Sequence, residues 1–231
     1  GKTKTYSGRG MDMCHMDGWL LLREGELLQG TLDKASVGGD SKASIFYVLL
    51  RELGSAYTID CMTRLSKLCA RYLGSRGFSI GIDDVTPGPR LRQRKEDLVH
   101  AGYVECDRNI EAFKRGELAL QPGCSAEQTL ESVLSGILSR IRDDCGQLCL
   151  QELSRFNAPL IMQWCGSKGS RINVSQMGAC VGQQIIAGSR IPDGFHSRSL
   201  PHFPHGSKTP AAKGFVQASF YSGLSPTEFF F

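Results

Sequence analysis

Two long segments of helical periodicity, joined by a turn, place the strongest constraint on the fold of this chain. Residues 125–156 carry apolar side chains three and four positions apart, which is the spacing of one face of an α-helix, and Ser125 begins a capping box. Residues 91–116 have the same period, weakened by Gly102, and "QPGC" at 121–124 indicates a turn between the two segments. The sequence therefore predicts an antiparallel helical hairpin. The apolar stripe of its second helix consists of Leu130, Val133, Leu134, Ile137, Leu138, Ile141, Cys145, Leu148 and Cys149.

Basic side chains lie between these apolar positions and are expected on the outer surface of the hairpin. Charged side chains on a helix most often only keep one face in water. A positive surface for an anionic or acidic partner is the alternative, and the hairpin alone leaves both open. The residues are Arg90, Arg92, Arg94, Lys95, Lys114, Arg115, Arg140 and Arg142.

The segment before the hairpin predicts a small mixed region. Residues 18–34 contain two short apolar runs on either side of Gly25, which indicates two strands joined by a tight turn. Helices are predicted at 45–53 and 57–73, and "FSIGI" at 78–82 predicts a short buried strand.

Glycine and proline mark the limits of this region. The second helix is expected to stop at Gly74 and Gly77. The two prolines of "DDVTPGPR" at 83–90 break regular structure, so this segment is the expected boundary before the hairpin.

The residues after the hairpin predict an extended strap that is held by apolar anchors. Residues 188–225 are rich in Gly, Pro and Ser but keep large apolar side chains, which argues against a disordered linker. His196, His202 and His205 have no acidic companion at ligand spacing, so no metal site is expected there. The expected anchors are Ile191, Phe195, Leu200, Phe203, Phe215 and Phe220. The whole pattern predicts an α+β fold that is mainly α.

Composition narrows the possible functions without choosing one. A net charge of +4 permits an anionic partner but is weaker than the charge of an autonomous nucleic-acid-binding protein. Nine cysteines without a CxxC pair indicate neither a disulfide framework nor a zinc knuckle, and they favour a reducing compartment. Cys145 and Cys149 are interpreted as small buried apolar groups. No apolar run reaches the ~18 residues of a membrane-spanning helix.

The segment 165–184, "CGSKGSRINVSQMGACVGQQ", places a lysine beside glycine directly before a segment with a helical period. It is not a P-loop, because Lys168 precedes Gly169 where that motif has the glycine before the lysine. Backbone amides at the helix start and the Lys168 ammonium could receive a phosphate. A glycine turn leading into an ordinary helix is the alternative, and the residues alone leave both open. The helix is expected to run to Ile186.

Longer strings resemble a known family. "CGSKGSRINVSQMGACVGQQIIAGSRIPDGFHSRSLPHF" and "AAKGFVQASFYSGLSPTEFFF" resemble the largest subunit of the multisubunit DNA-directed RNA polymerases. Within that family, "SRIPDGFHSRSLPHF", "SKTPAAKGFV" and "SFYSGL" are more similar to RNA polymerase III than to I or II. "GTLDKASVG" and "RGFSIGIDDVTPG" occur upstream in the family's order, so the resemblance covers residues 14–231 and is absent from the first dozen residues.

The resemblance implies a place within the polymerase. It makes residues 1–84 the pore region, 85–225 the funnel with its helical hairpin at about 91–156, and 226–231 the first turn of the bridge helix, which crosses the active-site cleft. Pore and funnel surround the secondary channel, through which nucleoside triphosphates enter and backtracked RNA leaves. The basic hairpin would then be a rim of that channel.

The resemblance also implies roles for single residues. Lys168 matches a lysine that approaches the incoming triphosphate, with Ser167 and Gly169 shaping its turn. A pocket beside the bridge helix, which binds the toxin amanitin in polymerase II, is matched by Gln183, Gln184, Arg190 and Phe195. The start of the bridge helix is matched by Pro226, Glu228 and Phe229, and Glu228 closes a capping box with Ser225.

As a piece of such a subunit, the chain would belong to a nucleotidyltransferase without carrying its catalytic centre. Neither the family's "DFDGD" loop, whose aspartates hold catalytic Mg²⁺, nor its trigger loop occurs here, so this chain alone is expected to be inactive and to bind no metal. Zn²⁺ is expected, if anywhere, in other parts of the subunit. A helix that begins this close to the last residue is unstable alone, which indicates a fragment of a longer protein.

The implied partners are other polymerase subunits including the second-largest, nucleoside triphosphates, template DNA, nascent RNA and a transcript-cleavage factor or subunit at the funnel. No membrane partner is expected, and the implied location is the nucleus. The alternative function is a non-catalytic helical interaction module that docks a partner such as a transcript-cleavage factor.

Overall fold

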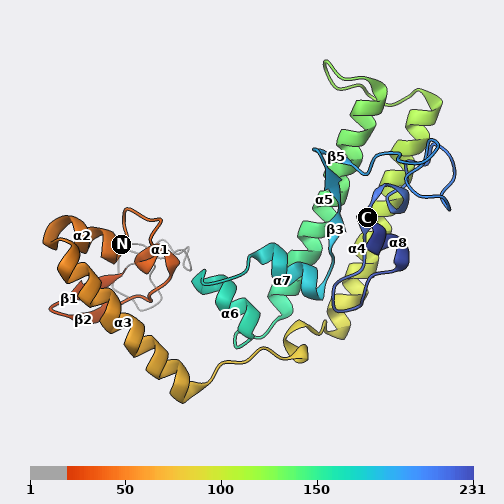
Figure 1. The fold of residues 1–231 in the computed structure, drawn as a ribbon. Coiled ribbons are helices and arrows are strands. Elements are labelled where there is room, and N and C mark those ends of the chain that lie inside the picture. The colour runs from red at the N-terminus through yellow and green to blue at the C-terminus, as the bar shows by residue number, and fades with distance from the viewer. Residues whose placement is uncertain (1–19) are drawn as a thin grey trace. The chain divides into compact units, whose positions relative to one another are not determined.

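The computed structural model describes residues 20–231, which form two compact units (Figure 1). The first unit contains the residues up to Gly81 together with Arg155–Ser170, and the second contains Ile82–Ser154 and Arg171–Phe231. Helices dominate and the strands form only short antiparallel pairs, which confirms the mainly α class of α+β fold.

The first unit contains the predicted hairpin of strands β1 (Leu21–Arg23) and β2 (Glu26–Gln29). Glu24 and Gly25 both adopt positive φ, at 51° and 82°, as a two-residue hairpin turn with the twist of its strands requires. The sequence predicted this hairpin, although residues 18 and 19 of the predicted range lie outside the described residues. A short helix that was not predicted, α1 (Lys34–Val37), follows behind a capping box of Asp33 and Ser36.

Helices α2 (Ile45–Leu53) and α3 (Ser55–Arg76) confirm the two helices predicted for this region. Of the two glycines predicted to stop this helix, Gly77 is confirmed and Gly74 is wrong, since α3 continues to Arg76 and Gly77 adopts a φ of 77° and donates its N–H to the Leu73 carbonyl. One glycine inside a helix costs only about 1 kcal/mol, whereas a left-handed residue ends the helix. Helix α6 (Ala158–Cys165), capped by Asn157, belongs to the same unit and was not predicted.

The strand predicted at 78–82 is wrong. Residues 78–81 have no regular structure, and Ile82–Val85 forms the short 3₁₀ helix η1. Phe78, Ile80 and Ile82 are exposed, and no segment among residues 20–231 pairs with them. Alternating apolar residues form a strand only where a partner takes up their backbone groups.

Helices α4 (Pro89–Arg115) and α5 (Ala126–Glu152) form the predicted antiparallel hairpin in the second unit (Figure 1). The connection turns at Pro122–Gly123, and Ser125 and Gln128 make the predicted capping box. Helix α5 ends four residues before the predicted 156, at Glu152. The hairpin stripes bury Leu91, Val99, Cys106, Ile110, Leu130, Leu134, Ile137, Leu138, Ile141, Cys145 and Cys149.

The predicted basic surface covers only part of the hairpin. Helix α4 carries seven Lys or Arg and five Asp or Glu, while α5 carries two and five. Arg115, Arg142 and Arg90 lie in ion pairs with acidic residues of the same hairpin. Several basic residues without an acidic residue between them occur only in the first two turns of α4, before Glu96.

Gly102, predicted to weaken the first helix, lies where α4 closely approaches Ile141 of α5. A Cβ atom at this position would lie 2.1 Å from Cδ1 and 2.7 Å from Cγ1 of buried Ile141. The glycine therefore allows the two helices to pack, which offsets its poor helix propensity.

Alanine at Gly102 is expected to destabilise the second unit by about 1 kcal/mol, because overpacking costs about 1–3 kcal/mol and exceeds the helix-propensity gain of about 1 kcal/mol. Gly136, in α5, provides the matched control, since a Cβ there meets nothing within 4 Å and Gly136→Ala should stabilise by about 1 kcal/mol. Protection of buried α5 amides from hydrogen exchange measures both. Equal gains from the two variants would contradict the close approach.

The part of the second unit after the hairpin, Arg171–Phe231, is called the return segment and is built from short elements that lie along the hairpin. Helix α7 (Arg171–Gly178) is followed by two antiparallel pairs and a 3₁₀ helix. The elements are β3 (Gly182–Gln183) paired with β6 (Phe215–Val216), β4 (Ile185–Ile186) paired with β5 (Ser189–Arg190), η2 (Ala211–Lys213) and α8 (Pro226–Phe230).

The prediction that the helix after Lys168 runs to Ile186 is wrong, because α7 ends at Gly178. The Val181 N–H donates to the Ala218 carbonyl and the Gln184 N–H to the Gly214 carbonyl, both at 2.9 Å. These bonds across the return segment take the donors that another helical turn would need.

The expected apolar anchors of this segment are confirmed only in part. Ile191 and Phe215 are buried, and Leu200 and Phe203 are half-buried. Phe195 and Phe220 are 50% and 58% exposed, so their prediction as anchors is wrong. Polar contacts, described below, supply the attachment that these two side chains do not.

Cys145 and Cys149 are buried apolar groups of the hairpin core, as interpreted from the sequence, and Cys106 is a third. Burial raises the pKa of Cys106 and Cys149 to about 11 and that of Cys145 to about 12. Their thiols therefore stay protonated at neutral pH and are poor nucleophiles. Within the described part of the chain, no helix combines the length and the apolar composition needed to cross a membrane.

Candidate functional site

Lys168 lies on a turn of two left-handed glycines in the first unit. Helix α6 ends at Gly166 (φ 77°), where the Ser167 N–H donates to the Met162 carbonyl at 3.1 Å, and Gly169 also has a φ of 77°. Lys168 itself is exposed and takes part in none of the ion pairs found among residues 20–231. The turn thus presents an ammonium group to solvent, three residues before α7 begins.

Gln183 and Gln184 lie at β3 of the second unit, and both amides bind backbone. Gln183 is buried, and its Nε2 donates to the carbonyls of Gln184 and Lys213 at 2.7 Å. Gln184 donates from Nε2 to the Gly182 carbonyl at 3.2 Å. The bond from Gln183 to Lys213 joins β3 to the later part of the return segment, whereas the bond from Gln184 stays next to β3.

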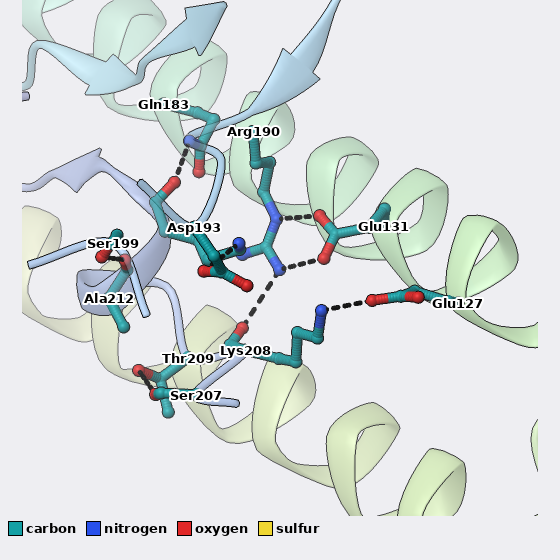
Figure 2. A network of polar contacts seen from close by, with 11 residues as sticks. Glu127, Glu131, Gln183, Arg190, Asp193, Ser199, Ser207, Lys208, Thr209 and Ala212 are labelled. Atoms are coloured by element: carbon teal, nitrogen blue, oxygen red, sulfur yellow. Dashed lines mark hydrogen bonds and ion pairs between the residues drawn. The ribbon is translucent and has the colours of Figure 1, made fainter. Parts of the chain in front are cut away.

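Arg190 forms the centre of a polar network between the return segment and α5 (Figure 2). Its side chain is 1% exposed, and Nε and Nη2 donate to the two carboxylate oxygens of Glu131 at 2.7 and 3.2 Å. Nη2 also donates to the Lys208 carbonyl at 3.1 Å. A bidentate pair of this kind fixes both distance and orientation.

Two further ion pairs flank Arg190 in this network (Figure 2). Lys208 Nζ lies 2.5 Å from Oε1 of Glu127, which precedes Glu131 by one turn on α5. The Lys208 ammonium lowers the pKa of the Glu127 carboxyl. Buried Lys213 donates to Asp193 at 2.9 Å. With Glu131 and Arg190 the network holds three cations and three carboxylates, a balance that suits a structural attachment.

Phe195 and the α8 residues lie near the surface. Phe195 pairs through its backbone with Arg198, and its ring is exposed. Pro226 takes the first turn of α8, where Glu228 forms the predicted capping box with Ser225, and Phe229 is exposed. Burial alone would raise the pKa of Glu228, but hydrogen bonds from the Ser225 and Ala218 N–H groups lower it overall.

A pocket of about 210 Å³ between α5 and α7 was missed by sequence reasoning. The helices approach closely at the lining residue Gly146, since a Cβ there would lie 2.8 Å from Ser175 Oγ. A glycine in the middle of an apolar helical stripe was the available signal for this contact. The lining residues are Arg142, Asp143, Gly146, Gln147, Leu150, Arg171, Ile172 and Ser175.

No group of three or more His, Cys, Asp or Glu side chains within residues 20–231 is arranged to hold a metal ion. Two of the three histidine rings of the return segment instead make contacts of other kinds. His205 Nδ1 lies 2.6 Å from the His196 carbonyl, and His202 lies against Phe203.

Known proteins match this chain along its whole length. The family models for RNA polymerase Rpb1, domain 3 and domain 4, match residues 1–85 and 110–216. DNA-directed RNA polymerase III subunit RPC1 is 57% identical over 230 residues in Bos taurus, 56% over 230 in Homo sapiens and 56% over 220 in Saccharomyces cerevisiae. The chain belongs to the RNA polymerase Rpb1 family. These three relatives are polymerase III subunits, which confirms the class indicated by the sequence strings.

The Rpb1 match has two further consequences. The alignments with the two mammalian subunits include 100% of this chain, so the expectation that the first dozen residues lack the resemblance is wrong. They include 16% of each relative, so the chain spans about one sixth of the length of the curated relatives it matches.

Proposed function

We propose that this chain forms the pore and funnel part of the largest subunit of RNA polymerase III, where it lines the channel for nucleoside triphosphate entry and backtracked RNA exit. Residues 1–84 would be the pore, 85–225 the funnel and 226–231 the start of the bridge helix. The polymerase III match along the whole chain carries this proposal. The exposed ammonium of Lys168 supports it, because a channel for triphosphates requires a cation that is available to them.

In this proposal the complete nuclear enzyme synthesises RNA on template DNA, together with the second-largest and other subunits. Catalytic Mg²⁺ would stabilise the transferring phosphate there. The ligands of this Mg²⁺, and any Zn²⁺ site, would lie in other parts of the subunit, since the aspartate-rich loop expected for the family does not occur in this sequence. The role of the residues of this chain is then to admit and orient the substrate electrostatically.

Lys168→Ala in the assembled polymerase should raise the KM for nucleoside triphosphates about fivefold, because one solvent-accessible charged contact to phosphate is lost. Lys42→Ala is the matched control, since Lys42 is an exposed lysine of the same unit. It should leave KM unchanged. Single-nucleotide addition rates measured against triphosphate concentration separate KM from the maximal rate. An unchanged KM for Lys168→Ala would remove the substrate-contact role.

The alternative, an interaction module that docks an acidic partner through the hairpin, has less support. The helices of the hairpin carry nine basic and ten acidic residues, so most of the surface offers no net attraction to an acidic factor. The positive part of the hairpin surface is limited to the start of α4. A transcript-cleavage factor remains a proposed partner of the complete enzyme.

A further inference from the structure

Helix α8 and the residue after it are held by groups that come from two separate places in the return segment, a backbone N–H and a pair of side-chain rings. On one side, Glu228 Oε1 accepts the Ala218 N–H at 3.2 Å, just after β6. On another, His202 Nε2 lies 3.3 Å from Thr227 Oγ1, and the Phe203 ring stacks on Phe231 with centroids 6.3 Å apart and planes 12° apart.

His202 and Phe203 lie in a loop of residues 196–206, which is closed by its own hydrogen bonds. His205 Nδ1 and the Gly206 N–H bind the carbonyls of His196 and Ser197, both at 2.6 Å. Arg198 Nη1 donates to the Phe203 carbonyl at 3.3 Å. The backbone of the loop is therefore preorganised, and little backbone freedom is lost when its two rings contact α8.

The same loop is fixed to the hairpin at both of its ends. Arg190, which precedes the loop, binds Glu131, and Lys208, which follows it, binds Glu127 (Figure 2). The Ser199 hydroxyl adds a bond to the Ala212 carbonyl inside the segment. A continuous set of contacts thus leads from α5 through the loop to Thr227 and Phe231.

We infer that His202 and Phe203 are positioning residues that set where the α8 helix starts relative to the hairpin. The inference rests on the proposed function, in which α8 begins the helix across the active-site cleft, and it names residues that act on the reaction through that helix. Neither side chain needs to contact substrate. A helix start held by a stacked ring and a hydroxyl contact tilts when these are removed, and a tilt changes the geometry at which substrate meets the reacting groups.

The first test uses Phe203→Leu, Phe231→Leu and the double variant in the assembled polymerase. Each single variant should lower the maximal elongation rate per assembled enzyme about three- to tenfold, well below the hundredfold that a 1 Å misplacement of reacting groups can cost. The KM for triphosphates should stay near the wild-type value. Because the two rings act through one contact, the double variant should be no slower than the slower single variant.

A purely structural role would lower the yield of assembled polymerase without changing the rate per assembled enzyme. Wild-type rates in both single variants, or effects that multiply in the double variant, would overturn the inference. If the wild-type complex that contains this chain makes no RNA on a template, the proposed function is overturned together with the inference. If the wild-type complex makes RNA and the variants have the wild-type rate, only the positioning role is overturned.

His202→Ala is the second test and does not depend on how well the Phe203 variants assemble, because His202 is exposed. It should slow elongation about threefold with KM unchanged. His196→Ala is the matched control, since His196 is exposed in the same loop and takes part in its hydrogen bonds through the backbone carbonyl, which the substitution keeps. Equal rates for His202→Ala and His196→Ala would count against the inference.

Discussion

Glu131→Ala should destabilise the second unit by about 3 kcal/mol, because it leaves the Arg190 guanidinium buried without its carboxylate. This is the low end of the cost of breaking a buried pair, since Glu131 keeps 28% exposure. Hydrogen exchange of buried α5 amides under native conditions provides the measurement.

Glu127→Ala is the control for Glu131→Ala. Glu127 lies one turn earlier on α5 and also binds a cation of the return segment, but its side chain is 62% exposed, so its loss should cost less than about 1 kcal/mol. The double variant Glu131→Leu/Arg190→Met should recover most of the stability lost in Glu131→Ala, because it removes both charges together. Similar costs for Glu127→Ala and Glu131→Ala would show that burial of Arg190 is not the cause.

Gly214→Ala should destabilise the same unit by about 2–5 kcal/mol through two separate effects. Gly214 has a φ of 85°, which costs an L-residue about 1–2 kcal/mol. An added Cβ would also lie 2.2 Å from Cγ1 of buried Ile191, and overpacking of this kind costs about 1–3 kcal/mol. The same exchange measurement on α5 amides, together with the thermal midpoint, reports the sum.

Gly188→Ala separates the two effects at Gly214. Gly188 has a nearly identical φ of 82°, but a Cβ there meets nothing within 4 Å. It should cost only the conformational part, about 1–2 kcal/mol. A Gly214→Ala variant no less stable than Gly188→Ala would mean that Ile191 moves aside without cost.

The hairpin could be predicted from the sequence because its signals are local. A stripe from Leu130 to Cys149, a capping box at Ser125 and a Pro-Gly turn each act within a few residues. The same holds for the β1–β2 turn at Glu24–Gly25 and for the capping box of α8. In each case local preference and final packing agree.

The failures lie where distant residues decide. Helix α7 ends because Val181 and Gln184 donate to carbonyls more than 25 positions away, and neither carbonyl is visible from the local pattern. At 78–82 the apolar residues lacked a strand partner among the described residues. Gly102 looked like a defect of one helix until Ile141 of the other was placed against it.

For the candidate site, the sequence indicated residues but not their environments. The exposed turn at Lys168 follows from its glycines, so its presentation to solvent could be anticipated. The attachment of Arg190 to Glu131 could not, because the pair joins positions 59 residues apart in sequence. The pocket between α5 and α7 likewise depends on a helix–helix contact, for which Gly146 was the only signal in the sequence.

The positions of Glu127 and Glu131 also bear on the stiffness of the hairpin. Each helix has 27 residues and is therefore about 40 Å long, and both glutamates lie in the first two turns of α5, next to the tip. A rod that is fixed only at its base bends more easily as its free length grows. The two ion pairs near the tip shorten the free length of the hairpin. A force applied at the tip would therefore be transmitted into the return segment before it could bend the hairpin.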